Sequence, residues 1–161
     1  MLFRSATQLA FTTQPGAGTG GSNLATQPVV TVQDAGGNTV TGATTAITLA
    51  IGTNAGSGTL SATTNPLSAT AGVATFAGVK IDKAGTGYTL TASATGLTGA
   101  TSSTFNVTVG SATQLAFTTQ PGAGTGGSNL ATQPVVTVQD AGGNTVTGAT
   151  TEITLAIGRS E

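Results

Sequence analysis

The sequence lacks the residues on which most catalytic and metal centres depend. It contains no cysteine, no histidine and no tryptophan among its 161 residues. Without cysteine there is neither a disulfide framework nor a thiolate metal ligand, and without histidine the commonest general base and metal ligand are missing. A serine nucleophile would have only Lys80 or Lys83 as a base. These absences predict that the chain is not an enzyme and holds no cofactor.

Charge is scarce as well. Four basic and five acidic residues give a net charge of −1, which provides no basic surface for nucleic acid and no acidic tail. No apolar run is long enough to span a membrane, so we expect neither nucleic-acid binding nor membrane insertion. The first residues lack the apolar stretch of a secretory signal peptide. Any export signal is therefore expected outside this sequence, in a longer protein.

Threonine and glycine are abundant, and the β-branched side chains are those of threonine, valine and, less often, isoleucine. β-branched side chains suit a pleated, half-buried surface, whereas disordered chains are usually poor in them. Short segments that alternate apolar and polar residues are separated by glycine-rich turn signals, and no segment shows a helical period. This pattern predicts an all-β fold.

One long repeat organises the chain. Residues 5–52 recur as residues 111–158, an offset of 106 (111 − 5), and of these 48 positions (52 − 4) only one differs, Ala46 against Glu152. The period is too long for a solenoid or a propeller and suits a β-sandwich domain of about 100 residues. We therefore predict one complete repeat at 5–110 and the incomplete first half of a second at 111–161.

Six strands are predicted in the complete repeat. They span residues 7–13, 28–33, 46–51, 73–81, 87–94 and 103–109. Residues 15–22 are expected to form a glycine-rich loop, and residues 52–72 a polar loop with room for a short strand. Near Gly78 the side-chain alternation changes face, as it does at a bulge. In the last strand Phe105, Val107 and Val109 are expected to point the same way.

Two segments resemble a known family. The sequences VQDAGGNTV (residues 32–40) and AGTGYTLTA (residues 84–92) look like the bacterial Ig-like repeats of large surface proteins, of the invasin and filamin type. The resemblance implies tandem immunoglobulin-like β-sandwiches at the cell surface, which serve adhesins, stalks, fibres and spacers alike. It also implies that Tyr88 forms a tyrosine corner, with its hydroxyl bonded to backbone. The second copy has Asp140 and Asn144 but no tyrosine half, so we do not expect it to fold independently.

Polar candidates for a binding site have simpler structural interpretations. Asp34 and Asn38 offer one carboxylate and one amide, well short of the roughly six to eight oxygens of a Ca²⁺ site, and a self-capping turn accounts for both. Lys80, Asp82 and Lys83 lie at a strand end, which favours a solvated edge over the Lys–Asn or Lys–Asp cross-link of some surface Ig-like domains. We expect no metal site.

Two further motifs are weak. The glycine-rich loop at 16–21 is followed by neither a lysine nor a helix, which disfavours a phosphate loop. Residues 106–108 form a glycosylation sequon within a predicted strand. The loops contain almost no aromatic residue or arginine, the usual anchors of an interface, which disfavours a glycan-binding or receptor-binding module.

The incomplete repeat predicts an assembly surface. Nothing in cis covers its apolar strand faces, so we expect contact with other copies of the chain in an open, head-to-tail arrangement. Ile153, Leu155 and Ile157 would supply register and burial, while Glu152 would keep that edge soluble, unless it reflects neutral drift.

The predicted function is therefore that of an extracellular structural protein. Its repeats would assemble into fibres or a surface array by intermolecular β-strand complementation. Two alternatives stay open. One is a passive spacer or stalk within a giant surface adhesin, and the other is an adhesin module that binds a glycan or receptor.

Overall fold

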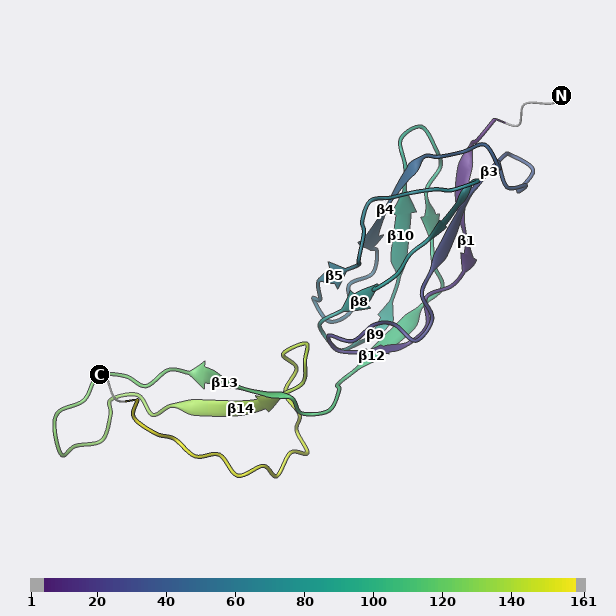
Figure 1. Ribbon diagram of the computed structural model, residues 1–161. Helices are drawn as coiled ribbons and strands as arrows, with labels where there is room; N and C mark the ends of the chain where they lie inside the picture. Colours follow the sequence, from purple (N-terminus) through teal and green to yellow (C-terminus); the bar gives the residue numbers. More distant parts are fainter. Residues whose placement is uncertain (1–4, 159–161) are drawn as a thin grey trace.

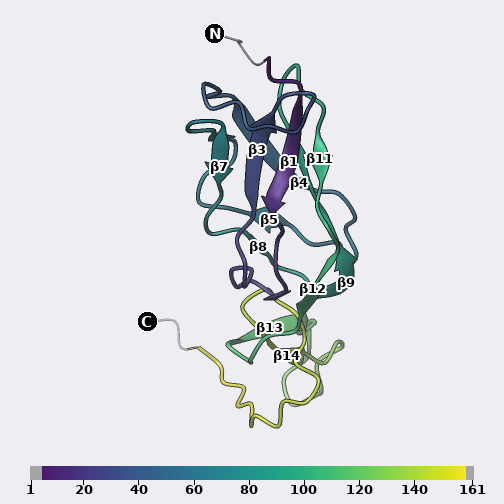
Figure 2. The same cartoon turned by 90° about the vertical axis from the view of Figure 1, so that its right-hand side faces the viewer.

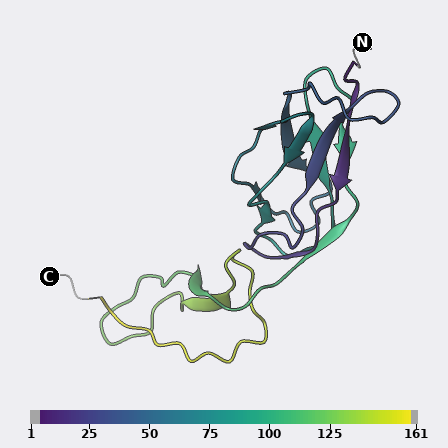
Figure 3. The ribbon, with the colours of Figure 1, turned by 45° about the vertical axis from the view of Figure 1, so that its right-hand side comes forward.

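The computed structural model describes residues 5–158, which are all-β and contain no helix (Figure 1). The chain has three segments: the N-terminal copy (residues 5–52), the closing segment (residues 53–109) and the C-terminal copy (residues 111–158). The first two form one sandwich-like body, and the third extends from its base as an arm (Figures 1 and 3). No part of the described chain forms an apolar helix of membrane-spanning length.

The strands are short and distributed over all three segments. In the N-terminal copy they are β1 (Gln8–Thr13), β2 (Gly18–Thr19), β3 (Val29–Gln33) and β4 (Ala46–Ile51). The closing segment holds β5 (Leu60–Ser61), β6 (Leu67–Ser68), β7 (Val73–Thr75), β8 (Lys80–Ile81), β9 (Gly85–Tyr88), β10 (Leu90–Ser93), β11 (Ala100–Thr101) and β12 (Phe105–Thr108). The C-terminal copy holds β13 (Gln114–Thr119) and β14 (Val135–Gln139).

The closing segment completes the sheets that the N-terminal copy begins. One sheet has the order β1-β3-β7 and another the order β11-β10-β4-β6, while β2-β12-β9 and β5-β8 lie toward the base. β1 and β3 pair within the N-terminal copy, but β7 is needed as their third strand. Both partners of β4 come from the closing segment. Neither main sheet could therefore form from the N-terminal copy alone.

The hydrophobic core lies between these sheets. The N-terminal copy contributes side chains such as Val30, Ile47 and Leu49, and the closing segment contributes others such as Phe76 and Leu90, all nearly inaccessible to solvent. Burial of each such side chain stabilises a fold by about 1.5–3 kcal/mol. Every member of the buried core cluster lies between residues 9 and 107. The sandwich-like body thus has a complete core without residues 111–158.

Several predicted strands differ from those observed. The strand at 46–51 is confirmed, whereas 73–81 is split into β7 and β8 around Gly78, which has φ 65°. The segment 87–94 is likewise two strands, β9 and β10, and β2 lies within the expected loop 15–22. Val109 does not join Phe105 and Val107 in the core; it is 44% exposed, because the chain leaves the sandwich there.

The C-terminal copy reproduces only part of the first. β13 and β14 pair in the register of β1 and β3, with the same irregularity, here between Phe117 and Thr119. Residues 152–157, equivalent to β4, are not a strand. Their two partner strands have no counterpart among the described residues. A strand that depends on distant partners is therefore lost although its sequence is nearly unchanged.

Candidate assembly surfaces

A tight turn of the C-terminal copy sits against the base of the sandwich. This junction turn (residues 140–144, Asp-Ala-Gly-Gly-Asn) contacts a surface made by residues 20–21, 82–84 and 110, called the socket below. The arm lies directly beneath β9 and β12 in Figure 2. The contact between the junction turn and the socket is called the junction.

The Asp140 carboxylate is at the centre of the junction and is completely buried. Its Oδ2 accepts a hydrogen bond from the Gly110 amide (2.8 Å), and its Oδ1 accepts bonds from the amides of Gly142 and Asn144 (both 2.9 Å). Burial raises the pKa of Asp140, but these donors and the Asn144 side chain more than offset it, so that the pKa is lowered. The bonds therefore favour a charged carboxylate at neutral pH.

The Asn144 side chain joins the turn to the socket through both of its polar atoms. Its Nδ2 donates to the backbone oxygen of Asp82 (2.7 Å), and its Oδ1 accepts from the amide of Ala84 (3.0 Å). The side-chain amide thus donates to and accepts from one backbone segment, as a neighbouring strand does in a β-ladder. Few side chains other than asparagine could make both at this length.

Lys83 adds a cation to the same contact. Its Nζ donates to the carbonyl oxygens of Gly142 (2.8 Å) and Gly143 (3.3 Å). The solvated edge expected for Lys83 from the sequence is therefore wrong, because the ammonium group binds the junction turn. Lys80, in contrast, is exposed on β8.

Glycines allow the turn and the socket to approach backbone to backbone. A methyl group at Gly21, which has φ 76°, would lie 2.6 Å from the Ala141 carbonyl carbon and the Gly142 nitrogen. A methyl group at Gly20 would lie 2.8 Å from the Asp140 carboxylate, and one at Gly142 would overlap the Asp82 carbonyl oxygen. Real Cβ atoms do not come this close to other atoms, so the fit requires glycine at these positions.

Tyr88 supports the socket from inside the sandwich. Its side chain is fully buried, its ring stacks on Phe105 with centroids 6.0 Å apart, and its hydroxyl donates to the Lys83 carbonyl oxygen (2.9 Å). Burial raises the pKa of Tyr88. The bond from a buried hydroxyl to backbone is the arrangement expected from the sequence. It holds the segment 82–84 that Asn144 binds.

The equivalent turn of the N-terminal copy lies at the other end of the sandwich. In this N-terminal turn (residues 34–38), Asp34 Oδ1 accepts from the amides of Gly36 and Asn38 (both 2.9 Å), and Asn38 Nδ2 donates to the same oxygen (3.1 Å). Only Gly37 of the two glycines has a positive φ, 80°. Residues 35–38 are exposed. No cluster of three or more metal-ligating side chains occurs in the described part of the chain.

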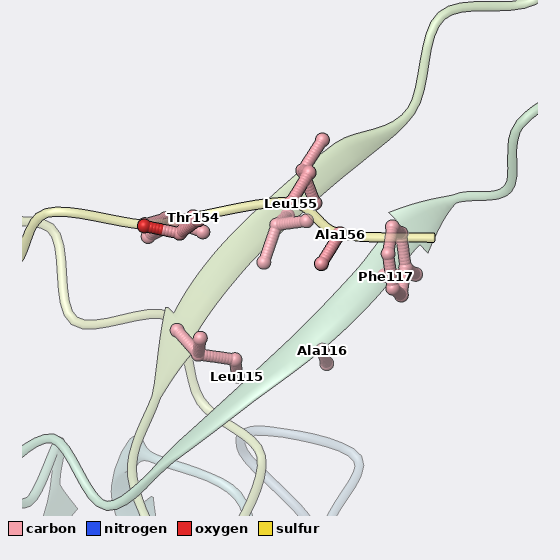
Figure 4. Close-up of a pocket in the computed structure, with 8 residues that line it drawn as sticks. Leu115, Ala116, Phe117, Thr154, Leu155 and Ala156 are labelled. Carbon is pink, nitrogen blue, oxygen red and sulfur yellow. The ribbon is translucent and has the colours of Figure 1, made fainter. Parts of the chain in front are cut away.

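A second surface is the uncovered face of the C-terminal copy. Leu115 is 53% exposed and Leu155 57%, whereas their equivalents Leu9 and Leu49 are 5% and 2% exposed. Leu115, Phe117 and Leu155 converge on one open hollow in Figure 4. Its full lining is Leu115, Ala116, Phe117, Val136, Ile153, Thr154, Leu155 and Ala156.

The residues predicted for assembly are only partly brought together. Ile153 and Leu155 line the hollow, whereas Ile157 lies outside it and is 97% exposed. Glu152, which precedes Ile153 in the chain, is exposed. The junction was not predicted, since its turn could be explained by local bonds alone. The identity of the two turns was the available signal.

Neither protein-family models nor curated proteins provide a match for the chain. The two surfaces are therefore interpreted from their own geometry.

Proposed function

We propose that the chain is a structural protein of tandem immunoglobulin-like repeats that assembles with other copies into fibres or a surface array outside the cell. The observation that carries the proposal is the uncovered face of the C-terminal copy. It presents the side chains that the N-terminal copy buries, from nearly the same sequence. At about 1.5–3 kcal/mol per fully buried side chain, covering four or five of them is worth of the order of 10 kcal/mol.

The occupant of this face is another copy of the chain. Each chain has one closing segment for two copies, and that segment is engaged with the N-terminal copy through β7, β6 and β10. If two chains exchanged closing segments, each chain would still have one copy with an uncovered face. The sandwich of another copy offers its edge strands β7 and β6, and a contact between such an edge and the uncovered face joins unlike surfaces, so it does not close on itself. The low charge of the chain does little to oppose this contact.

β-strand complementation supplies the backbone bonds of the contact. The edge of β14 that corresponds to the β7 side of β3 has no strand beside it among the described residues, and neither have residues 152–157. An added strand satisfies these backbone groups and buries alternate side chains. Ile153 and Leu155 would then regain the alternation that Ile47 and Leu49 have in β4. No catalytic step, metal or cofactor is part of the proposal, so a chelator should leave the melting temperature unchanged.

Sedimentation velocity with negative-stain microscopy tests the proposal. The wild-type chain should form concentration-dependent assemblies, and the double variant Leu115→Asp, Leu155→Asp should be monomeric, because two charges would be buried unpaired. Thr118→Asp is the matched control. Thr118 also lies on β13, but its equivalent Thr12 stays exposed in the complete sandwich, so this variant should assemble like wild type.

Two results would contradict assembly through this face. One is a wild-type chain that stays monomeric and is cleaved by protease after Gly110. The other is removal of residues 111–161 without any effect on the assemblies, which would show that the C-terminal copy is not the connector.

The junction favours a second candidate, a passive spacer or stalk. A buried carboxylate and a bonded asparagine fix the arm against the sandwich, as expected where successive repeats hold a constant orientation. A monomeric wild-type chain whose junction amides are protected from hydrogen exchange would favour this function.

A further inference from the structure

The same five-residue turn occurs at both ends of the sandwich; it is seated on the socket at one end, and its residues 35–38 are exposed at the other. The junction turn is seated on the socket, where Asp140 is buried and Asn144 makes both of its cross-contacts. The N-terminal turn has the identical sequence. It lies at the opposite end because β1 and β3 are antiparallel, and its residues 35–38 are exposed.

The N-terminal turn already has the shape that the socket accepts. Asn38 Nδ2 donates to Asp34 Oδ1 at 3.1 Å, and the corresponding bond from Asn144 to Asp140 is 3.0 Å. The backbone bonds correspond as well, with Asp34 N to Asn38 O at 2.9 Å and Asp140 N to Asn144 O at 3.0 Å. A turn that forms without its partner loses little conformational freedom on docking.

Among the described residues, nothing outside the turn lies near the glycines that would enter a socket. A methyl group at Gly36 would meet only atoms of its own turn, Asn38 Nδ2 at 3.1 Å and Asp34 Oδ1 at 3.4 Å, and nothing lies near one at Gly37. Gly142, the equivalent of Gly36, faces the Asp82 carbonyl oxygen directly. The internal hydrogen bonds of the two turns are therefore the same, and the junction turn is the one that the described residues show seated on a socket.

We propose that the N-terminal turn is a docking element whose partner is the socket of a second sandwich of this sequence. Asn38 would bond the backbone of the partner's segment 82–84, and the ammonium group of the partner's residue 83 would bind the carbonyl oxygens of Gly36 and Gly37. The contact joins unlike surfaces and does not close on itself, so repetition gives a head-to-tail row. It lies at the opposite end from the uncovered face and is independent of assembly through that face.

In the wild-type chain the socket is filled by the junction turn of the same molecule. An intramolecular partner on a short connection acts at an effective concentration of about millimolar. Docking between molecules is therefore expected only when the socket has been vacated. This requirement provides a defined experiment with two full-length chains.

The socket donor carries Asp140→Ala and Asn144→Ala to vacate the socket, and Asn38→Ala to remove its own docking element. The turn donor keeps the wild-type N-terminal and junction turns. Both carry Leu115→Asp and Leu155→Asp, so that the uncovered face cannot contribute. Their melting temperatures, compared with that of the Leu115→Asp, Leu155→Asp chain, verify that the sandwich is folded.

Sedimentation equilibrium of the mixture should detect a one-to-one complex that neither chain forms alone. Asn38→Ala in the turn donor should weaken it at least tenfold, and so should Gly36→Ala, which leaves the turn intact but blocks the approach to residue 82. Absence of a complex at millimolar concentration, or equal affinity of the three turn donors, would overturn the inference. Failure of the proposed function is seen separately, as a monomeric wild-type chain.

Discussion

The N-terminal and C-terminal copies differ at one of 48 positions and yet have different structures. The hairpin partners β1–β3 and β13–β14 share one register, because each pair is complete within its own copy. Residues 46–51 form β4, whereas 152–157 form no strand, because the partners of β4 lie in the closing segment. Nearest-neighbour pairing thus follows from the repeated sequence itself, and the remaining strands depend on what the rest of the chain supplies.

The two turns, in contrast, have the same internal structure in both copies. Their internal hydrogen bonds match in length, but Asp140 is buried and residues 35–38 are exposed. The turn is therefore a preformed unit, and its position in the chain determines whether it has a socket. Each substitution in one copy has an internal control at the position 106 residues away.

The largest effect is expected from the core leucines. Leu49→Ala should destabilise the sandwich by about 2–5 kcal/mol, the usual cost of truncating a buried leucine, because Leu49 is 2% exposed. Leu155→Ala should leave the stability of the sandwich unchanged, since Leu155 lies outside the core cluster. Urea unfolding at low protein concentration measures both. Equal destabilisation would mean that the two copies share one core.

Strands whose apolar and polar side chains alternate regularly could be predicted from the sequence. The strand at 46–51 was predicted correctly because Ile47, Leu49 and Ile51 alternate with small or polar residues. The segment 73–81 was predicted as one strand because the break at Gly78 requires a positive φ that glycine allows but does not impose.

The junction was beyond sequence reasoning for a different reason. It joins Gly20, Asp82 and Asn144, which are far apart in the chain and show no shared pattern. Asp140 and Asn144 have a sufficient local role in capping their own turn, so nothing indicated a second role. The exposed or buried state of such a turn is a property of the tertiary structure.

The second effect concerns the glycines of the two turns. Gly142→Ala should raise the ratio of open to closed junction at least tenfold, because the added methyl group overlaps the Asp82 carbonyl oxygen. Gly36→Ala should have little effect, since only atoms of its own turn are near. Hydrogen exchange at the amides of Ala84 and Gly110 reports docking. Unchanged protection in Gly142→Ala would show that the junction is not closed in solution.

The third effect appears only in acid. The pKa of Asp140 is lowered from its usual value of 3.8, because the hydrogen bonds to the carboxylate outweigh the opposing effect of burial. A lowered folded-state pKa contributes stability that is present above the unfolded value and is lost as the pH falls through the folded value. The junction should therefore keep its full stability at pH values above 3.8 and lose it progressively as the pH falls below that value.

Asp140→Asn is the control for this pH dependence. Its junction should be weaker at neutral pH and should not change further in acid through this residue. The same amides, Gly110 in particular, provide the measurement. Opening of the wild-type junction near neutral pH would contradict the assignment of Asp140 as its titrating group.

A smaller effect is expected at Tyr88, which has no counterpart in the described C-terminal copy. Tyr88→Phe removes the bond to the Lys83 carbonyl oxygen and should destabilise the sandwich by around 1 kcal/mol. Because that bond positions segment 82–84, exchange at the Ala84 amide should also increase. Loss of stability without a change in exchange at Ala84 would show that Tyr88 does not position segment 82–84.

The smallest effect is a gain in stability at Thr31. The Thr31 hydroxyl is buried and has no hydrogen-bond partner among the described residues. Its equivalent Thr137 is half-buried and accepts a bond from Gln139 Nε2 (3.1 Å). The two copies therefore place the same hydroxyl in opposite situations, and the third strand β7, beside Thr31 alone, is the difference.

Valine replaces this hydroxyl with a methyl group of similar size. Thr31→Val should stabilise the sandwich by up to about 1 kcal/mol, because an unpaired buried hydroxyl is removed and apolar surface is added. Thr137→Val should give no such gain, since it loses a bond at a site still open to water. Thermal unfolding of the two variants decides the point. A destabilised Thr31→Val chain would show that the hydroxyl is hydrogen-bonded in solution and that β7 does not isolate it.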